Sequence, residues 1–308
     1  MQYRTDLAIE QAQNWSGASG IRMRSARLNG FTRTEVEVQS EEAARRLQKP
    51  MGRYITFETA PVHSLAQEAR QALSGEIACV LRSLLPPFGD VLVVGLGNRH
   101  ITSDALGSRV CESVLVTRHL KDTLPPPLQG RLRGVSALAP GVLGITGMET
   151  ADMVRGAVEQ TLPAAIIAVD ALSARECGRI GTAIQVTDTG IQPGSGVGNH
   201  RMGLTLSTLG IPVIAVGVPT VVYSTVIVRD ALTLLLRSMP EEQGDHAAAA
   251  DALARKVTQQ QLGELVVTPR EIDQMVGELS QVLAMGLNLA LQPRLSIQEI
   301  TTLMNEAM

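Results

Sequence analysis

The sequence predicts an α/β fold in which a central, mostly parallel β-sheet is flanked by helices, with a small strand-rich part at the N-terminus. Two short runs, Val91–Gly95 and Ala165–Val169, are almost wholly aliphatic, which is typical of parallel strands buried on both faces. Segments in which apolar residues recur at helical spacing lie before and between these runs. This alternation along the chain is the pattern of an open α/β sheet.

The first 60 residues contain short extended runs separated by glycine and polar residues. Ile21–Leu28, Thr34–Val38 and Tyr54–Glu58 therefore predict strands. From Val62 to Leu84 the apolar residues fall at helical spacing, which predicts a helix. The prolines at positions 86 and 87 end it, because proline cannot continue a helical hydrogen-bond pattern.

Two helices are expected next to the aliphatic strands. One covers Ala105–Leu120 and has Thr102 or Ser103 as its N-cap. The other covers Glu149–Leu162, and Thr146 stands at capping-box spacing before its first residue. Both helices connect strands of the predicted sheet.

Further strands are predicted at Ile184–Val186 and Pro212–Val218. Residues 211–228 carry no charge, but proline, glycine and β-branched residues interrupt or dominate the stretch. It is interpreted as a buried strand, a turn and the start of a helix rather than a membrane span. The polar, alanine-rich segment 241–261 predicts an exposed helix or a mobile insertion.

The C-terminal part contains two capping-box patterns, Thr268–Glu271 and Ser296–Glu299, and each predicts the start of a helix. The chain shows neither an internal repeat nor a long linker. We therefore expect one α/β domain over residues 7–308, with a strand-rich addition at 7–60 and C-terminal helices at 268–308.

The composition argues against several classes of function. The chain has 308 residues, a net charge of -3 and only 2% aromatic residues, so direct binding of nucleic acid is not expected. It has 3 cysteines and no C-x-x-C pair, which argues against a disulfide framework and fits a reducing cytoplasm. The N-terminal residues have no apolar signal region, and we expect no association with membranes.

Two acidic residues lie just beyond the carboxyl ends of strands, where the active sites of open α/β sheets are usually found. Asp170 directly follows the strand at 165–169, and Asp104 follows the strand-turn Gly95–Asn98. Two neighbouring carboxyls do not both ionise readily, so such a pair supplies an acid and a base that can activate water against an amide. The alternatives are a helix-dipole role for Asp104 and a capping or turn role for Asp170, with Arg175 as an ion-pair partner.

Other motifs give weaker signals. Gly95-x-Gly97 suggests a nucleotide-binding module, but His100 stands where the dinucleotide fingerprint requires glycine. The glycine-rich run 194–199 lacks the lysine of a P-loop, and Pro193 replaces the first glycine of a serine-hydrolase elbow. A flexible active-site or structural loop is the favoured interpretation of this run.

A set of longer motifs extends over most of the chain, from residue 4 to about residue 291. They are Val94–Asn98, Thr102–Gly107, Val116–Leu120, Ala139–Val142, Gly144–Gly147, Ala168–Leu172 with Ala174–Arg175, Asp188–Asn199 and Leu209–Val222. The segment Asp188–Asn199 is the most specific of them. Together these motifs resemble the germination protease family of spore-forming bacteria.

The resemblance implies an endopeptidase that degrades small acid-soluble spore proteins, the DNA-coating proteins of dormant spores, when germination begins. It also implies a zymogen, a homotetramer, a location in the forespore or spore core, no cofactor, and two functional aspartates that match Asp104 and Asp170. The family is distantly similar to hydrogenase maturation endopeptidases, which share the G-x-G-N strand-turn, so a phosphorylase/hydrolase-like sheet is expected.

Family substrates are cut after an acidic residue within a recurring short pattern, and Thr5–Glu10 has the same layout. We therefore predict a propeptide of residues 1–6 and self-cleavage between Asp6 and Leu7. Asn98 and main-chain N–H groups near Gly95 or Gly196 are the predicted support for the tetrahedral oxyanion.

Two further alternatives remain at this point. One is a metal-assisted peptidase that uses Asp104 and Asp170 with His100 or His119. The other is a non-catalytic relative that only binds peptides.

Overall fold

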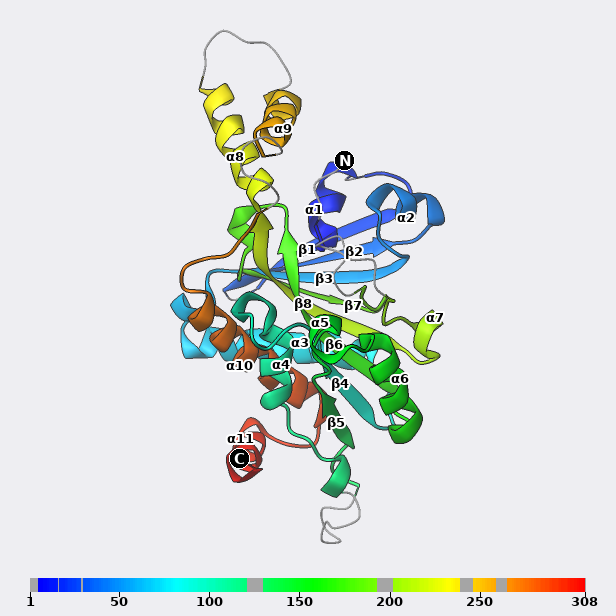
Figure 1. Ribbon diagram of the computed structural model, residues 1–308. Coiled ribbons are helices and arrows are strands. Elements are labelled where there is room, and N and C mark those ends of the chain that lie inside the picture. The colour runs from blue at the N-terminus through cyan, green and yellow to red at the C-terminus, as the bar shows by residue number, and fades with distance from the viewer. Residues whose placement is uncertain are drawn as a thin grey trace.

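The computed structural model describes residues 5–15, 17–28, 30–120, 130–192, 202–238, 246–258 and 265–307. In this part of the chain a single 9-stranded sheet has the order β1-β2-β3-β7-β8-β6-β4-β5, and β9 pairs with β8 (Figure 1). The strands are β1 (Ile21–Leu28), β2 (Phe31–Val38), β3 (Gly52–Thr59), β4 (Val91–Gly95), β5 (Val135–Leu138), β6 (Ala165–Ala174), β7 (Ala183–Thr187), β8 (Val213–Tyr223) and β9 (Val266–Val267).

The half of the sheet formed by β8, β6, β4 and β5 is parallel, and β7, β3, β2 and β1 extend it by antiparallel pairing. The prediction of a mostly parallel central sheet flanked by helices is thus confirmed. The N-terminal strands do form, and they continue the main sheet because β3 pairs with β7.

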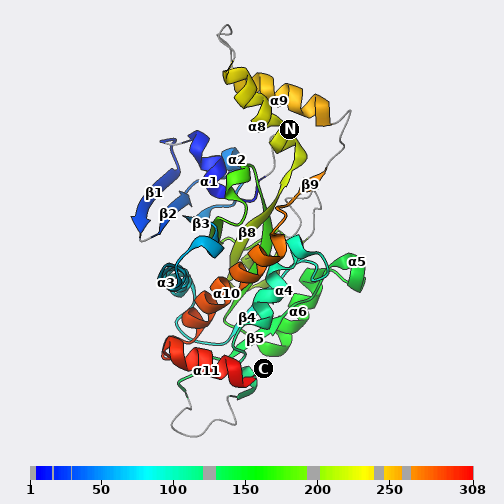
Figure 2. The same cartoon turned by 90° about the vertical axis from the view of Figure 1, so that its left-hand side faces the viewer.

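Helices cover both faces of the sheet, as the two views in Figures 1 and 2 show. Side chains of α3, α4 and α10 share one apolar cluster with the strands, whereas those of α6 belong to a second cluster with β4, β6 and β8. The helices are α1 (Ala8–Ala12), α2 (Glu41–Leu47), α3 (Gln67–Leu84), α4 (Leu106–Glu112), α5 (Leu143–Thr146), α6 (Thr150–Thr161), α7 (Leu206–Leu209), α8 (Ser224–Arg237), α9 (His246–Val257), α10 (Ile272–Leu291) and α11 (Ile297–Ala307).

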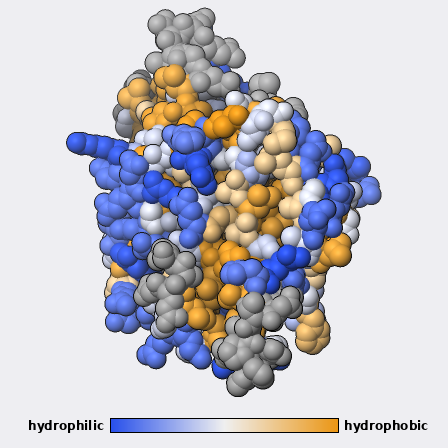
Figure 3. All heavy atoms as spheres, turned by 60° about the horizontal axis from the view of Figure 1, so that its bottom comes forward, coloured by the Kyte–Doolittle hydropathy of each residue, from blue (hydrophilic) through white to orange (hydrophobic). Residues whose placement is uncertain are grey.

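Helices α8 and α9 pack on each other beyond one end of the sheet (Figure 1). The expected helix within 241–261 is confirmed as α9, and residues 239–245 and 259–264 lie outside the described part. On the face shown in Figure 3, hydrophobic side chains form a band between hydrophilic flanks. Among the described residues, no helix combines the length and the apolar character needed to cross a bilayer.

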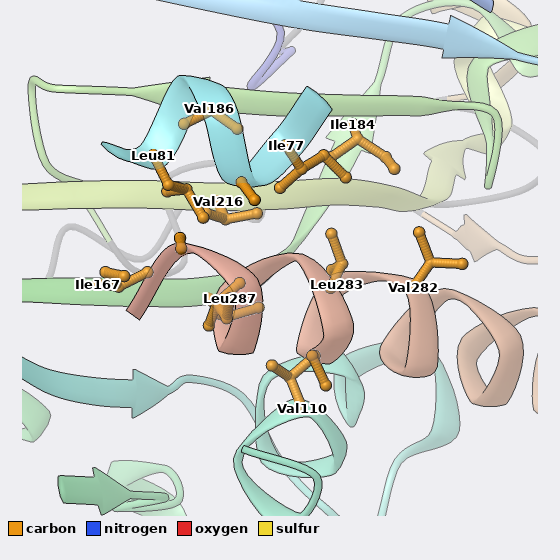
Figure 4. Packing of buried hydrophobic residues seen from close by; sticks show 14 of the residues in the cluster. Ile77, Leu81, Val110, Ile167, Ile184, Val186, Val216, Val282, Leu283 and Leu287 are labelled. Atoms are coloured by element: carbon orange, nitrogen blue, oxygen red, sulfur yellow. The ribbon is translucent and has the colours of Figure 1, made fainter. Parts of the chain in front are cut away.

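The main core lies between the sheet and the helix pair α3 and α10. Figure 4 shows Ile77 of α3 and Leu283 of α10 directed toward Ile184 and Val216 of the sheet. These side chains are fully buried, and burying an aliphatic side chain of this size contributes roughly 1.5–3 kcal/mol. This packing makes the sheet a rigid platform for groups at its edge.

Several helix starts differ from the prediction because the hydroxyls expected to cap them bond elsewhere. Thr102 belongs to a 3₁₀ turn (Thr102–Asp104) and does not cap α4, because its Oγ1 donates to the carboxylate of Asp273 at 3.0 Å. The helix predicted at Ala105–Leu120 is wrong in its length, since α4 covers only Leu106–Glu112. The Oγ1 of Thr268 donates to the carbonyl of Thr220 at 2.9 Å, and α10 begins at Ile272. Thr146 ends α5 and caps nothing in α6.

One predicted capping box is confirmed. The Ser296 Oγ accepts the N–H of Glu299 at 3.2 Å, and the Glu299 carboxylate accepts the N–H of Ser296 at 2.7 Å. The expected turn between the strand at 212–218 and its following helix is wrong, since β8 continues to Tyr223 and α8 begins at the next residue.

Candidate active site

The turn after β4 holds Asp104 in place. The main-chain N–H of Asn98 donates to Oδ2 of Asp104 at 2.7 Å. Gly97 has a φ of +97°, and a Cβ at this position would overlap the carbonyl oxygen of Asp104. Only glycine accepts this conformation and this close approach without strain, which explains the second glycine of the G-x-G-N motif.

Asp170 lies on β6 one residue beyond the end of its pairing with β4. Its side chain is only 7% exposed, and its carboxylate accepts the N–H of Ala171 at 2.9 Å. The pKa of Asp170 is raised well above its ordinary value, first by burial and then by the negative charges of Asp104 and Asp6. The two predicted aspartates are therefore brought together, close enough for the charge of Asp104 to act on Asp170.

A further contact fixes the turn of Asp104 against the sheet. The Oγ1 of Thr220 in β8 donates to the carbonyl oxygen of Ser103 at 2.6 Å. Since β8 is the strand beside β6, this bond holds Asp104 next to the strand that carries Asp170.

A cavity of about 1070 Å³ opens at this edge of the sheet, and Asp6, Asn98, Asp104 and Asp170 all line it. Leu7 follows Asp6 and is fully buried. The predicted oxyanion group at Gly196 lies outside the described residues. The N–H of Asn98 is engaged by Asp104, so its side-chain amide is the part of this residue that remains for an oxyanion.

The N-terminal segment occupies the edge of β6 that β4 leaves free. The main-chain N–H of Asp6 donates to the carbonyl oxygen of Ser173 at 3.1 Å. In return, the N–H and the Oγ of Ser173 donate to the Asp6 carboxylate at 2.8 and 3.0 Å. This part of the chain is thus bound along the same strand that carries Asp170.

Two more side chains hold the main chain of this segment. Lys49 Nζ donates to the carbonyl oxygens of Asp6 and Thr5 at 2.9 and 3.3 Å. Gln185 Nε2 donates to the carbonyl oxygen of Asp6 at 3.1 Å, and its Oε1 accepts the N–H of Ala8 at 2.7 Å. Burial lowers the pKa of Lys49, and the negative charges of Asp6 and Glu10 oppose that shift.

Sequence reasoning missed Lys49, Gln185 and Ser173. Lys49 follows a helix, Gln185 lies inside a strand and Ser173 stands three residues after Asp170, so no local motif singles them out. The sequence holds one signal, because Ser173 and Gln185 are polar residues within mostly apolar strands. Both are 2–6% exposed, and buried polar groups require partners.

Glu10 anchors the helix that follows Leu7. Its side chain is fully buried, and its carboxylate accepts the N–H groups of Arg175 and Glu176 at 2.8 and 3.0 Å and the guanidinium of Arg179 at 3.3 Å. Arg175 donates to the carbonyl oxygen of Glu10 at 2.6 Å. The expectation that Arg175 pairs with Asp170 is therefore wrong, because its guanidinium is directed to α1.

Neither His100 nor His119 is among the described residues that line the cavity. Over the described ranges, no group of three or more histidine, cysteine, aspartate or glutamate side chains is arranged to hold a metal ion. Cys79, Cys111 and Cys177 are all free thiols.

Comparisons with known proteins agree with the resemblance seen in the motifs. Germination proteases of Clostridium acetobutylicum and Caldanaerobacter subterraneus are 39% and 38% identical to the chain, and each alignment covers 98% of it and 98–99% of the relative. The germination protease of Bacillus velezensis is 37% identical over 95% of the chain and 94% of its own length.

A hydrogenase maturation protease, HycI from Thermococcus kodakarensis, is a distant structural neighbour. The two chains are 18% identical, the match covers 68% of this chain and 98% of the other, and the TM-score is 0.32. At the level of the family, residues 2–263 match the germination protease family, Peptidase_A25. The chain belongs to the germination protease family and is a peptidase of that kind.

Proposed function

We propose that this germination endopeptidase hydrolyses peptide bonds with Asp104 and Asp170 as its acid and base. The observation that carries the proposal is that both carboxyls line one cavity and that Asp104 raises the pKa of the buried Asp170. Two coupled carboxyls that titrate apart can hold one proton between them at working pH, which is what acid–base hydrolysis of an amide requires.

In the proposed reaction Asp170 begins protonated and Asp104 begins ionised. The Asp104 carboxylate takes a proton from a water molecule, whose oxygen forms a bond to the scissile carbonyl carbon. Asp170 gives its proton to the carbonyl oxygen. When the tetrahedral intermediate collapses, the carbon–nitrogen bond breaks and the proton held by Asp104 passes to the leaving nitrogen, while one hydroxyl of the intermediate returns a proton to Asp170 as the carbonyl forms again.

We also propose that the chain is a zymogen that cuts itself between Asp6 and Leu7. Thr5 and Asp6 line the same cavity as the two aspartates, and Asp6 acts electrostatically on Asp170. The protein substrates would be small acid-soluble spore proteins, cut after an acidic residue in the forespore or spore core. A homotetramer remains part of this proposal and is tested by light scattering on the purified chain.

Intact-mass measurement tests self-cleavage. Full-length protein held at mildly acidic pH should lose residues 1–6, because a lower pH increases the fraction of molecules in which one carboxyl of the aspartate pair is protonated. The matched Asp104→Asn chain should keep its full mass under the same conditions. A wild-type chain that retains its first six residues across the whole pH range would overturn the zymogen proposal.

A chelator separates the acid–base mechanism from a metal-assisted one. Cleavage of a peptide that contains Thr-Glu-Phe-Ala-Ser-Glu should proceed at an unchanged rate after dialysis against EDTA. If the rate falls and a divalent metal restores it, the carboxyls act as metal ligands instead. Binding of the peptide without any cleavage would support the non-catalytic alternative.

A further inference from the structure

The carbonyl oxygen of Asp6 is held by two side-chain donors that converge on it. Lys49 Nζ and Gln185 Nε2 lie at 2.9 and 3.1 Å from this oxygen. They come from residues far apart in the sequence, one after α2 and one in β7. Donors at these distances from a carbonyl are positioned to stabilise the negative charge that the oxygen acquires when the carbon is attacked.

The carboxylate of the same residue has a separate recognition site. Ser173 donates both its main-chain N–H and its Oγ to Oδ2 of Asp6, at 2.8 and 3.0 Å. Ser173 is 2% exposed, so both donors are shielded from water and would lose a partner if no carboxylate were present. Hydrogen bonds to a charged acceptor are stronger than those to a neutral one, so this arrangement favours an acidic side chain.

We infer that Lys49 and Gln185 form the oxyanion site of this peptidase and that Ser173 selects the acidic residue whose carbonyl is attacked. This inference rests on the proposed self-cleavage between Asp6 and Leu7. The acidic residue of a protein substrate would occupy the same place once Asp6 has left it. Lys49 and Gln185 then touch the reacting oxygen, while Ser173 determines specificity.

Charge complementarity supports this assignment. An ammonium beside the carbonyl oxygen stabilises the negative charge that develops on this oxygen in the transition state, before the proton transfer from Asp170 is complete, and the partly buried position of Lys49 strengthens the effect. The carboxylate in the Ser173 site has a second consequence, since its charge also raises the pKa of Asp170. An acidic residue in this site therefore helps to keep the catalytic acid protonated.

Substitution of Lys49 tests the oxyanion role through the rate of self-cleavage of the full-length chain, followed by intact mass. Lys49→Met keeps the length of the side chain and removes the charged donor, and the rate should fall about 10²–10³-fold. Lys256→Met, which removes an exposed lysine on α9, is the matched control and should cleave at the wild-type rate. Gln185→Glu keeps the acceptor for Ala8 and removes the donor to Asp6, so it should also slow cleavage.

A double-mutant cycle tests the selectivity of Ser173. In the wild-type background Asp6→Asn should slow self-cleavage about tenfold or more, because the two donors lose a charged acceptor. The Ser173→Ala background lacks the Oγ donor and keeps the main-chain N–H, so there the same change should have a smaller effect. If the role of Ser173 were purely structural, Asp6→Asn would slow self-cleavage by the same factor in both backgrounds, because free-energy effects at independent groups add.

The outcomes separate this inference from the proposal on which it rests. If the wild-type chain is never cut at Asp6–Leu7, the zymogen proposal fails and the inference fails with it. If the wild-type chain is cut, and Lys49→Met is cut equally fast, the oxyanion assignment is overturned while self-cleavage stands. Equal effects of Asp6→Asn in the wild-type and Ser173→Ala backgrounds overturn only the assignment of selectivity to the Ser173 side chain.

Discussion

Replacement of Asp104 or Asp170 by asparagine is expected to slow peptide cleavage by about 10²–10⁴-fold, the contribution typical of a positioned acid or base. Asparagine cannot take a proton from water or give one to a carbonyl oxygen. Its amide oxygen can still accept the N–H groups of Asn98 and Ala171, which Asp104 and Asp170 now bind, so the fold should persist. Peptide cleavage and circular dichroism measured on the same samples check both statements.

Asp152→Asn is the matched control for these variants. Asp152 is an exposed aspartate of α6 that pairs with Arg155, and exposed ion pairs of this kind contribute about 0–1 kcal/mol. This variant should therefore retain full activity. Near-normal cleavage by either Asp104→Asn or Asp170→Asn would refute the acid–base pair.

The raised pKa of Asp170 also gives a pH-dependent effect on stability. Between its unfolded value, about 3.9, and its raised folded value, the folded protein holds a proton that the unfolded chain has released. The free energy of unfolding therefore falls as pH rises through this window. Asp170→Asn mimics the protonated form, so its stability relative to wild type should be smallest near pH 3 and should increase toward neutral pH.

The two aspartates could be found from the sequence because each stands next to a strand that is recognisable by itself. The runs before Asp170 and before the turn of Asp104 are aliphatic and short, and parallel strands place their carboxyl ends at one edge of a sheet. Their proximity then requires only that the two strands be neighbours, as β4 and β6 are.

Contacts between elements that are distant in the sequence could not be predicted from sequence patterns. Lys49 and Ser173 meet at Asp6 because β3 pairs with β7, β7 pairs with β8, and the N-terminal segment lies on the free edge of β6. No local pattern encodes these pairings. The same reason explains the wrong helix caps, since the hydroxyls of Thr102 and Thr268 have tertiary partners that compete with capping.

The layout of Thr5–Glu10 predicts a cleavage motif, and in the structure its last residue, Glu10, has a structural role. Glu10 binds two main-chain N–H groups after β6 and the side chain of Arg179. The residues that follow Asp6 are therefore part of the core, with Leu7 and Ala8 fully buried. Loss of residues 1–6 would leave this anchored helix in place.

Glu10→Gln should have the largest effect on stability of any conservative change in this region. The amide would place its NH₂ group opposite a main-chain donor and would leave Arg179 without a buried negative partner. Breaking a buried ion pair costs about 3–5 kcal/mol, and the value should lie near the lower end because Arg179 also pairs with Glu58 and Glu176. Thermal unfolding should show Tm lowered by roughly 5–10 °C.

Glu42→Gln provides the comparison, because Glu42 is an exposed glutamate of α2 that pairs with Arg46 four residues on. Its loss should cost only about 0.3–0.5 kcal/mol. Self-cleavage gives a second measurement, since a loosened α1 would release Asp6 from Ser173, and Glu10→Gln should therefore process more slowly than Glu42→Gln. Equal Tm values for the two variants would mean that the buried carboxylate adds no net stability, so that its desolvation cancels its bonds.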